Sequence, residues 1–286
     1  FTQWMASFTP DNPAAQIANV HTLFNIVTTL LLLPFGTQLA RISEKLLPDK
    51  PQKTTDEERW FEDLLASEHV LGVSVIARKQ LNEDISRMLT LAASNVETSF
   101  LAFEHRDEYE LEQIQKREEE IDLYNAQLSR RISRVLAVEN SPSEVNALNR
   151  MFSIIGNVER IGDHASDIAE IIPHLVIVRK EGDPAVSQAI RMGQKAHKMI
   201  LDALNALTSE NEQAALRVIA ADDEVDYDFN AIKHTLAQEI AADPGKVDAA
   251  LDLLMVIKYL ERIGDHAVNL AEWVEFVRSG RYHNEN

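Results

Sequence analysis

Apolar residues recur at steps of three and four along most of the chain, which is the spacing of amphipathic α-helices. Serine, aspartate and proline interrupt this pattern at Ser141-Pro142 and at Asp183-Pro184, where they are typical of a helix start. For the first half of the chain, the pattern predicts helices over about 70–104 and 109–138 and a third that opens at 143. For the second half it predicts a helix that opens near 183 and two further helices, separated by turns at 208–211 and 243–245. The last of these ends near 278. The short loops predict an all-α protein with two tandem antiparallel three-helix bundles.

One stretch of the third predicted helix returns in the sixth. Residues 159–170 read ERIGDHASDIAE and residues 261–272 read ERIGDHAVNLAE, with nine of the twelve positions identical. A helical unit has therefore been duplicated. The acidic residues of the first copy project from one helix face about 80° wide, whereas Ile161, Ala165 and Ile168 lie opposite and predict the buried seam. Packing explains the apolar residues but not the acidic ones.

The middle helix of each unit carries a second acidic pair. Glu118 precedes Asp122 by four residues, and Asp222 precedes Asp226 by the same step. Such pairs share a helix face, and like charges there cost a few tenths of a kcal/mol each. A bound cation would relieve this cost, and carboxylate oxygens suit Mg²⁺, Ca²⁺, Mn²⁺ or iron. The alternative is a solvated acidic face.

Two other residue types repeat within the motif. His164 and His266 project away from the carboxylates, so we predict that they form hydrogen bonds rather than bind a metal. Gly162 and Gly264 lie in mid-helix, where glycine costs about 1 kcal/mol relative to alanine. Their repetition predicts close approach of another helix.

The first fifty residues contain a separate apolar segment. No Lys, Arg, Asp or Glu occurs between Asn12 and Ala40. About twenty residues suffice to cross a bilayer, so we predict an N-terminal transmembrane helix over about 17–40. Lys and Arg occur only after this segment, which places the following region in the cytoplasm. The alternative is a buried helix, because Pro34 and Gly36 shorten the apolar run.

Composition narrows the classes of function. The 286 residues include no cysteine, which excludes disulfides, thiolate metal sites and a cysteine nucleophile. The formal net charge of −18 disfavours nucleic acid as a partner and suits cations. No P-loop, G-x-G-x-x-G or G-x-S-x-G motif occurs, so we predict that the protein is not an enzyme. The first residue is Phe1 rather than Met, which predicts an excerpt of a longer protein.

These segments together resemble two families. The segment from Asn12 to Asn25 and the apolar run to Phe35 resemble the last membrane segment of bacterial sodium/phosphate cotransporters. The two ERIGDHA motifs and the acidic middle helices resemble the PhoU family of phosphate-signalling regulators. A PhoU-like domain behind a sodium/phosphate transport domain is an arrangement found in that cotransporter family.

The resemblance implies the C-terminal portion of a sodium-dependent phosphate transporter. Residues 1–48 would end its membrane domain, 49–69 would be a linker with a short amphipathic helix, and 70–286 would be a PhoU-like regulatory domain. The two repeats would cover about 70–181 and 182–286. The protein would lie in the inner membrane with the PhoU-like domain in the cytoplasm. Its partners would be inorganic phosphate, with sodium as the coupling ion, and phosphate-signalling proteins or a second copy of the chain.

The resemblance also implies metal ions bound by carboxylates, divalent or trivalent, such as iron, zinc, manganese or magnesium. In the first repeat the candidate ligands are Glu118, Asp122, Glu159, Asp163 and Asp167. In the second repeat they are Asp222, Asp226, Glu261, Asp265 and Asn269. The family often has Asn at the position of Asn269, so Asp167 adds a charge to the first set.

Two other readings compete with the transporter. One is a non-transporting PhoU-like adaptor that regulates phosphate uptake and signalling, whose apolar N-terminal segment docks on a partner. The other is a di-iron oxidase of the ferritin type. That class needs Glu-x-x-His pairs on two helices, and the bundles contain none.

Overall fold

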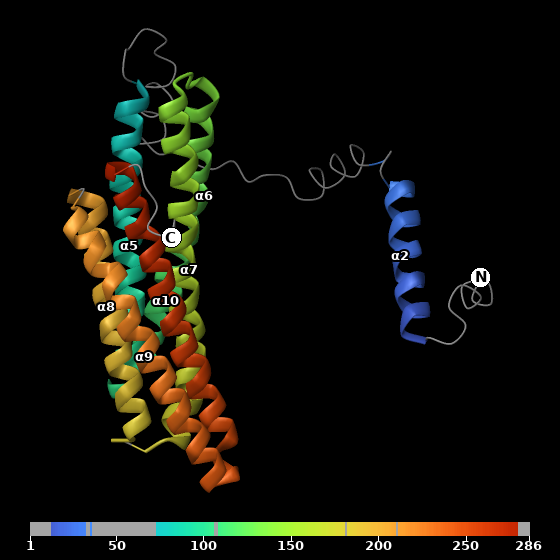
Figure 1. The fold of residues 1–286 in the computed structure, drawn as a ribbon, viewed down its shortest axis with the longest axis vertical. Coiled ribbons are helices and arrows are strands. Elements are labelled where there is room, and N and C mark those ends of the chain that lie inside the picture. The colour runs from blue at the N-terminus through green and yellow to red at the C-terminus, as the bar shows by residue number, and fades with distance from the viewer. Residues whose placement is uncertain are drawn as a thin grey trace. The chain divides into compact units, whose positions relative to one another are not determined.

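The computed structural model describes residues 13–32, 35, 73–105, 108–180, 182–209 and 211–279 (Figure 1). The chain divides into two compact units, Phe1–Arg59 and Trp60–Asn286, and each is described by itself. Every helix or turn within the described residues is built from local hydrogen bonds, and none of these residues lies in a strand. The all-α prediction is therefore confirmed for this part of the chain.

Of the first unit, the structure describes the long helix α2 (Pro13–Leu32). Polar residues interrupt its apolar sequence, and Asn25 Nδ2 lies 3.0 Å from His21 Nδ1 on one side of it. Among the described residues, no helix combines the length and the apolar character that a membrane crossing requires. The transmembrane helix predicted over 17–40 is therefore not found within the described residues. Residues 33–34 and 36–40, and the predicted linker over 49–69, lie outside them.

Where the structure describes it, the second unit has six long helices in chain order, with one short 3-10 turn before the last (Figure 1). The elements are α5 (Val73–His105), α6 (Glu108–Val138), α7 (Pro142–Val178), α8 (Pro184–Ser209), α9 (Glu212–Ala242), η2 (Pro244–Lys246) and α10 (Val247–Ser279). Each of α5, α6 and α7 packs against the other two, and so do α8, α9 and α10. The prediction of two three-helix bundles is therefore confirmed.

The two bundles share one core. Helix α5 packs on α8 and α7 packs on α10, whereas α6 and α9 each pack mainly within their own bundle. The seam predicted on α7 is buried, with Ile161, Ala165 and Ile168 fully enclosed. Alanines line much of the second bundle, for example Ala196 and Ala203 on α8. Small side chains let neighbouring helices approach closely, which fixes where the acidic residues of adjacent helices meet.

The predicted helix starts are also found. The Asp183 carboxylate accepts hydrogen bonds from the backbone N–H groups of Ala185 and Val186 at the start of α8. The Asn211 side chain accepts one from the Ala214 N–H at the start of α9. These bonds satisfy amide groups that a helix start leaves without partners.

A buried ion pair links two helices of the first bundle. Arg131 Nη1 on α6 donates to Asp84 Oδ2 on α5 at 2.7 Å, and both side chains are less than one-tenth exposed. Arg87 and Gln80 also contact the Asp84 carboxylate, at 3.3 and 3.4 Å. Because burial makes an uncompensated charge costly, removing either partner would destabilise the packing of α5 against α6.

Candidate metal centre

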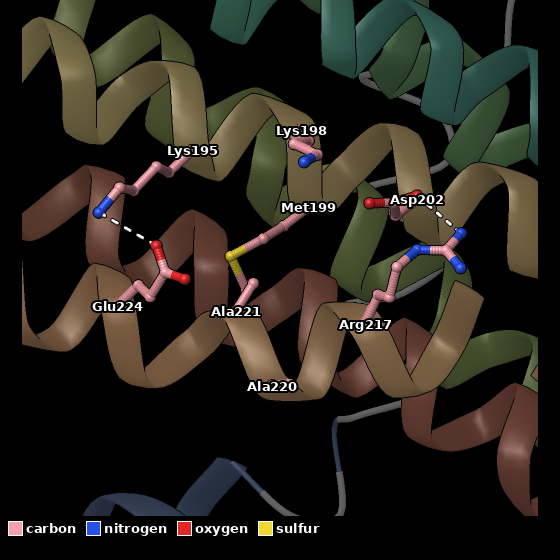
Figure 2. Close-up of a pocket in the computed structure, with 8 residues that line it drawn as sticks. All are labelled: Lys195, Lys198, Met199, Asp202, Arg217, Ala220, Ala221 and Glu224. Carbon is pink, nitrogen blue, oxygen red and sulfur yellow. Dashed lines mark hydrogen bonds and ion pairs between the residues drawn. The ribbon is translucent and has the colours of Figure 1, made fainter. Parts of the chain in front are cut away.

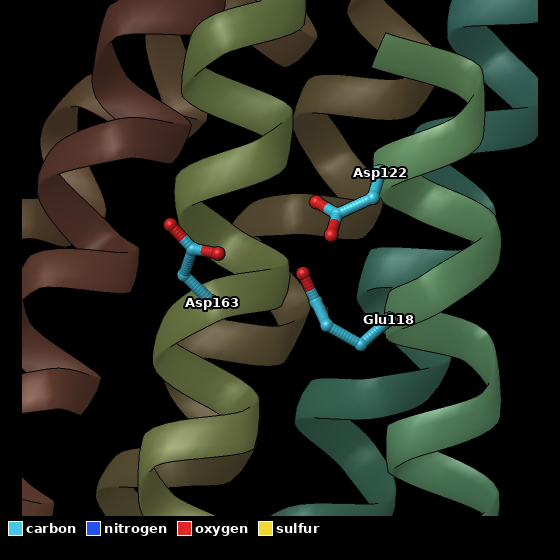
Figure 3. A group of neighbouring side chains, drawn as sticks. All are labelled: Glu118, Asp122 and Asp163. Atoms are coloured by element: carbon cyan, nitrogen blue, oxygen red, sulfur yellow. The ribbon is translucent and has the colours of Figure 1, made fainter. Parts of the chain in front are cut away.

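Three of the predicted ligands of the first bundle converge in space (Figure 3). Glu118 and Asp122 project from successive turns of α6, and Asp163 projects toward them from α7. One carboxylate oxygen from each lies within 4.8 Å of the other two. Glu118 and Asp163 are half-buried and Asp122 is exposed, so the cluster opens to solvent on one side.

A glycine makes this convergence possible. A Cβ atom at Gly162 would lie 2.6 Å from Glu118 Oε2 and 3.0 Å from Ile121 Cδ1. The Glu118 carboxylate therefore occupies the volume that a side chain on α7 would fill. The close helix approach predicted from this mid-helix glycine is confirmed.

The Glu118 carboxylate is unusual in its surroundings. Both of its oxygens are buried and accept no hydrogen bond from the described residues. The Asn95 amide donates to the Ile114 carbonyl oxygen at 3.1 Å, and its interaction with Glu118 only partly offsets the effects that raise the pKa of that carboxyl group. Burial, and then the negative charges of Asp163 and Asp122, raise the pKa of Glu118 to about 8.

These features fit a cation. A buried carboxylate without hydrogen-bond partners costs free energy, and a metal ion supplies the missing partner. The donor set consists of carboxylate oxygens alone, which favours hard cations such as Mg²⁺ or Mn²⁺ and allows iron. Glu118, Asp122 and Asp163 would hold such an ion.

The other two predicted ligands of the first bundle lie on the same face of α7. Glu159 is close enough to raise the pKa of Glu118 through its charge. Asp167 instead lies 3.3 Å from His164 Nδ1. The structure therefore places Glu159 beside the cluster and turns Asp167 toward the neighbouring histidine.

The predicted ligands of the second bundle come together less closely. Burial and then the charges of Asp226 and Asp265 raise the pKa of Asp222 to about 6, so these carboxylates face one another. However, in the part of the chain that the structure describes, only the first bundle brings three acidic or imidazole ligand atoms within 4.8 Å. A Cβ at Gly264 would lie 3.6 Å from Asp222 Oδ1, an ordinary contact. The shorter aspartate leaves space where Glu118 fills it.

Basic residues form ion pairs with two of the predicted ligands of the second bundle. The Lys258 ammonium forms a short ion pair with the Glu261 carboxylate, and Arg262 Nη1 lies 3.4 Å from Asp265 Oδ2. Asn269 Nδ2 donates to Asn157 Oδ1 on α7 at 3.0 Å. Glu261, Asp265 and Asn269 therefore each have a partner within the protein.

The two histidines lie where α7 packs on α10. Their rings stack with centroids 5.6 Å apart, and the Tyr259 ring also stacks with His164, at 5.4 Å. His266 Nδ1 lies 2.8 Å from Asn157 Oδ1. Burial, and then electrostatic interaction with His164 and Arg160, lower the pKa of His266 to about 4. Each histidine thus has a hydrogen-bond partner within the protein, His164 with Asp167 and His266 with Asn157.

A separate hollow of about 280 Å³ lies between α8 and α9 (Figure 2). Four of its charged side chains pair across it: Lys195 Nζ lies 3.3 Å from Glu224 Oε2, and Arg217 Nη2 lies 3.2 Å from Asp202 Oδ1. Glu224 thus points toward α8, whereas Asp222 points toward α10. This hollow is distinct from the carboxylate sets and concentrates no single sign of charge.

Sequence reasoning missed three of the residues that shape these sites. Lys258 lies three residues before Glu261, a spacing that predicts contact on a helix and was available in the sequence. Asn157 on α7 contacts His266 on α10, and Tyr259 on α10 contacts His164 on α7. Nothing in the sequence shows which turns of α7 and α10 meet, so these two could not be found in that way.

Comparison with known families identifies the repeat. The PhoU domain matches residues 85–172 and, a second time, residues 189–274. The chain belongs to the PhoU family. The five candidate ligands of each bundle lie within the corresponding PhoU match.

Curated relatives of this PhoU-family chain carry the name phosphate-specific transport system accessory protein PhoU homologue. The relative from Clostridium acetobutylicum is 31% identical over 206 residues, covering 71% of this chain and 93% of the relative. The relative from Caulobacter vibrioides is 32% identical over 205 residues, covering 70% of this chain and 87% of the relative.

Solved PhoU structures share the fold. The crystal structure of PhoU from Pseudomonas aeruginosa aligns with a TM-score of 0.69 and 24% identity, over 72% of this chain and 99% of that one. The phosphate transport system regulatory protein PhoU from Streptococcus pneumoniae aligns with a TM-score of 0.64 and 22% identity, over 73% and 98%.

These findings correct the main functional expectation. The chain was expected to be the C-terminal portion of a sodium/phosphate cotransporter, and that interpretation is wrong. The relatives are named as accessory proteins, and the match covers most of their length. Symport, sodium coupling and a membrane domain are not supported by relatives named as accessory proteins. No described helix meets the requirements of a membrane span. An apolar segment followed by positive charge was too weak a signal to identify a transporter.

Proposed function

We propose that this chain is a non-transporting regulator of phosphate uptake and signalling. The observation that carries the proposal is the match of both bundles to the PhoU domain, together with relatives named as accessory proteins of phosphate transport. Regulation rather than catalysis agrees with a chain in which no nucleophile motif was found. We place its site of action in the cytoplasm, where phosphate-signalling partners are available.

We further propose that the carboxylate sets bind divalent or trivalent cations, with Glu118, Asp122 and Asp163 as the principal site. A bound cation would neutralise these charges and hold α6 against α7. The support is geometric: three carboxylates converge, and both oxygens of Glu118 are buried without a hydrogen bond among the described residues. Glu159 lies beside them and would complete the shell of oxygen ligands.

The partners in this proposal are proteins of phosphate transport and phosphate signalling. The formal net charge of −18 works against nucleic acid as a partner. A metal-stabilised contact between α6 and α7 offers such partners a defined surface on the first bundle. Loss of the metal would alter that surface without unfolding the bundle.

A complementation experiment tests the regulatory role. The gene for this chain replaces the phoU-type gene of a bacterium whose phosphate-starvation genes drive a fluorescent reporter. We expect the reporter to stay off in high phosphate with the wild-type chain and to be on without it. Constitutive reporter expression, despite normal levels of the folded chain, would contradict the proposal.

Matched variants then test the role of the carboxylates. We expect Asp163→Asn to weaken repression in high phosphate, because it removes a charge from the converged cluster. Asp202→Asn removes an acid from the hollow between α8 and α9 and should leave repression unchanged. Equal repression by the two variants would show that regulation does not depend on the charge of the carboxylate cluster.

A further inference from the structure

The second carboxylate set contains a lysine ammonium that the first set lacks. In the second bundle, the Lys258 ammonium pairs with Glu261, and this pair is partly sheltered, with side chains 36% and 15% exposed. Lys258 Nζ also lies 5.3 Å from the centre of the Phe229 ring on α9, within cation–π range. The ammonium is therefore held between an acid of the predicted set and an aromatic ring of the neighbouring helix.

The first bundle has no counterpart of this lysine. Aligning the two ERIGDHA motifs places Gly156 at the position of Lys258, because each lies three residues before the first glutamate of its motif. A Cβ at Gly156 would meet no atom within 4 Å, so the position faces open space. Glu159 consequently has no ammonium beside it from its own helix.

The arginines do not account for the difference, because both bundles have them. Arg160 pairs with Asp163 at 3.0 Å, and Arg262 pairs with Asp265 at 3.4 Å, in the same i, i+3 arrangement. Asn269 replaces the charge of Asp167, but it lies at the far end of the motif and donates to Asn157. Compared with the first set, the second set therefore has one more positive charge, that of Lys258.

We propose that Lys258 is a built-in competitor for cations at the second carboxylate set, so that the first bundle binds metal ions more tightly than the second. The inference rests on the metal binding proposed above. A metal ion at Glu261 must displace the ammonium or share its carboxylate, and either event lowers affinity. At Glu159 no such displacement is needed. The duplicated motif thus yields two sites that fill at different metal concentrations.

The test uses the 286-residue chain and Mn²⁺ alone, with free Mn²⁺ measured by electron paramagnetic resonance. Asp265→Asn isolates the first site and Asp163→Asn isolates the second. Adding Lys258→Met to Asp163→Asn removes the ammonium and keeps an apolar chain against Phe229. We expect its Mn²⁺ affinity to rise about two- to fivefold, the upper part of the range for losing one partly exposed ion pair.

The reciprocal change transplants the competitor. Gly156→Lys, added to Asp265→Asn, should lower Mn²⁺ affinity at the first site by a similar factor. This variant should fold, since the position is open and lysine favours a helix over glycine. Lys233→Met, added to Asp163→Asn, is the control: Lys233 lies 5.1 Å from the same Phe229 ring but bonds to Asn230. It should change affinity less than twofold.

The outcomes separate the two claims. Unchanged Mn²⁺ affinity in both the Lys258→Met and the Gly156→Lys variants would overturn the role of Lys258 and leave metal binding intact. The same holds if Lys233→Met matches Lys258→Met. Absence of Mn²⁺ binding by the wild-type chain would overturn the proposed metal sites, and this inference with them.

Discussion

The two bundles contain nearly the same twelve-residue motif, yet they surround it differently. In the first, the longer side chain of Glu118 reaches into the space that Gly162 leaves on α7, and both its oxygens are buried. In the second, Asp222 stops one methylene short, and Lys258 pairs with Glu261. The motif fixes the backbone and the placement of its acids. Residues outside the motif determine how many of the carboxylates are left without a basic partner and can bind a cation.

The largest expected effect concerns the buried ion pair of the first bundle. Arg131→Met removes the 2.7 Å partner of the buried Asp84 carboxylate, and the contacts of Asp84 to Arg87 and Gln80 are longer, so we expect a loss of about 3 kcal/mol in unfolding free energy. Urea denaturation at pH 7 measures it. Thr235, which occupies the matching position on α9, is partly exposed, and Thr235→Met should change stability by less than about 0.5 kcal/mol. Equal losses of unfolding free energy in the two variants would show that the ion pair does not stabilise the first bundle.

The next effect is a dependence of stability on pH. The folded pKa of Glu118, about 8, lies above its ordinary value of 4.5, so the folded protein holds a proton that the unfolded chain has lost. Stability should therefore fall as pH rises between these values when metal is removed by a chelator. We expect Glu118→Gln to flatten this slope in urea denaturation between pH 7 and 8.

The second bundle supplies the control for that slope. The pKa of Asp222 is raised only to about 6, so Asp222→Asn should leave the slope between pH 7 and 8 unchanged. His266, with its pKa lowered to about 4, gives a slope of opposite sign below its ordinary value of 6.5 and contributes nothing in this range. A slope that survives Glu118→Gln would mean that another group carries it.

The smallest effect compares the two glycines. Gly264→Ala meets only ordinary contacts and removes a glycine from mid-helix, so it should stabilise the protein by up to about 1 kcal/mol. Gly162→Ala places Cβ 2.6 Å from Glu118 Oε2 and must displace that carboxylate, so this gain should be cancelled or reversed. Thermal denaturation of the metal-free proteins measures both. An equal gain in both variants would contradict the close contact at Gly162.

Much of this architecture follows from the sequence. The helix breaks at Ser141-Pro142 and Asp183-Pro184, the buried seam on α7 and the close approach at Gly162 were all predictable, because they depend on local spacing. The meeting of Glu118 with Asp163 could be proposed but not established, since it depends on the register of α6 against α7. The Asn157–His266 contact joins residues of different bundles and has no local signal. The apolar N-terminal segment misled the functional reading because helical hydropathy alone does not define a transporter.

The most direct test of the principal metal site is crystallographic. Crystals of the 286-residue chain are grown with limiting Mn²⁺, and anomalous difference maps are calculated at the manganese absorption edge. We predict a strong peak between Glu118, Asp122 and Asp163, and a weaker peak or none beside Asp222, Asp226 and Asp265. A peak only at the second set, or none at either, would contradict the assignment of the first bundle as the principal metal site.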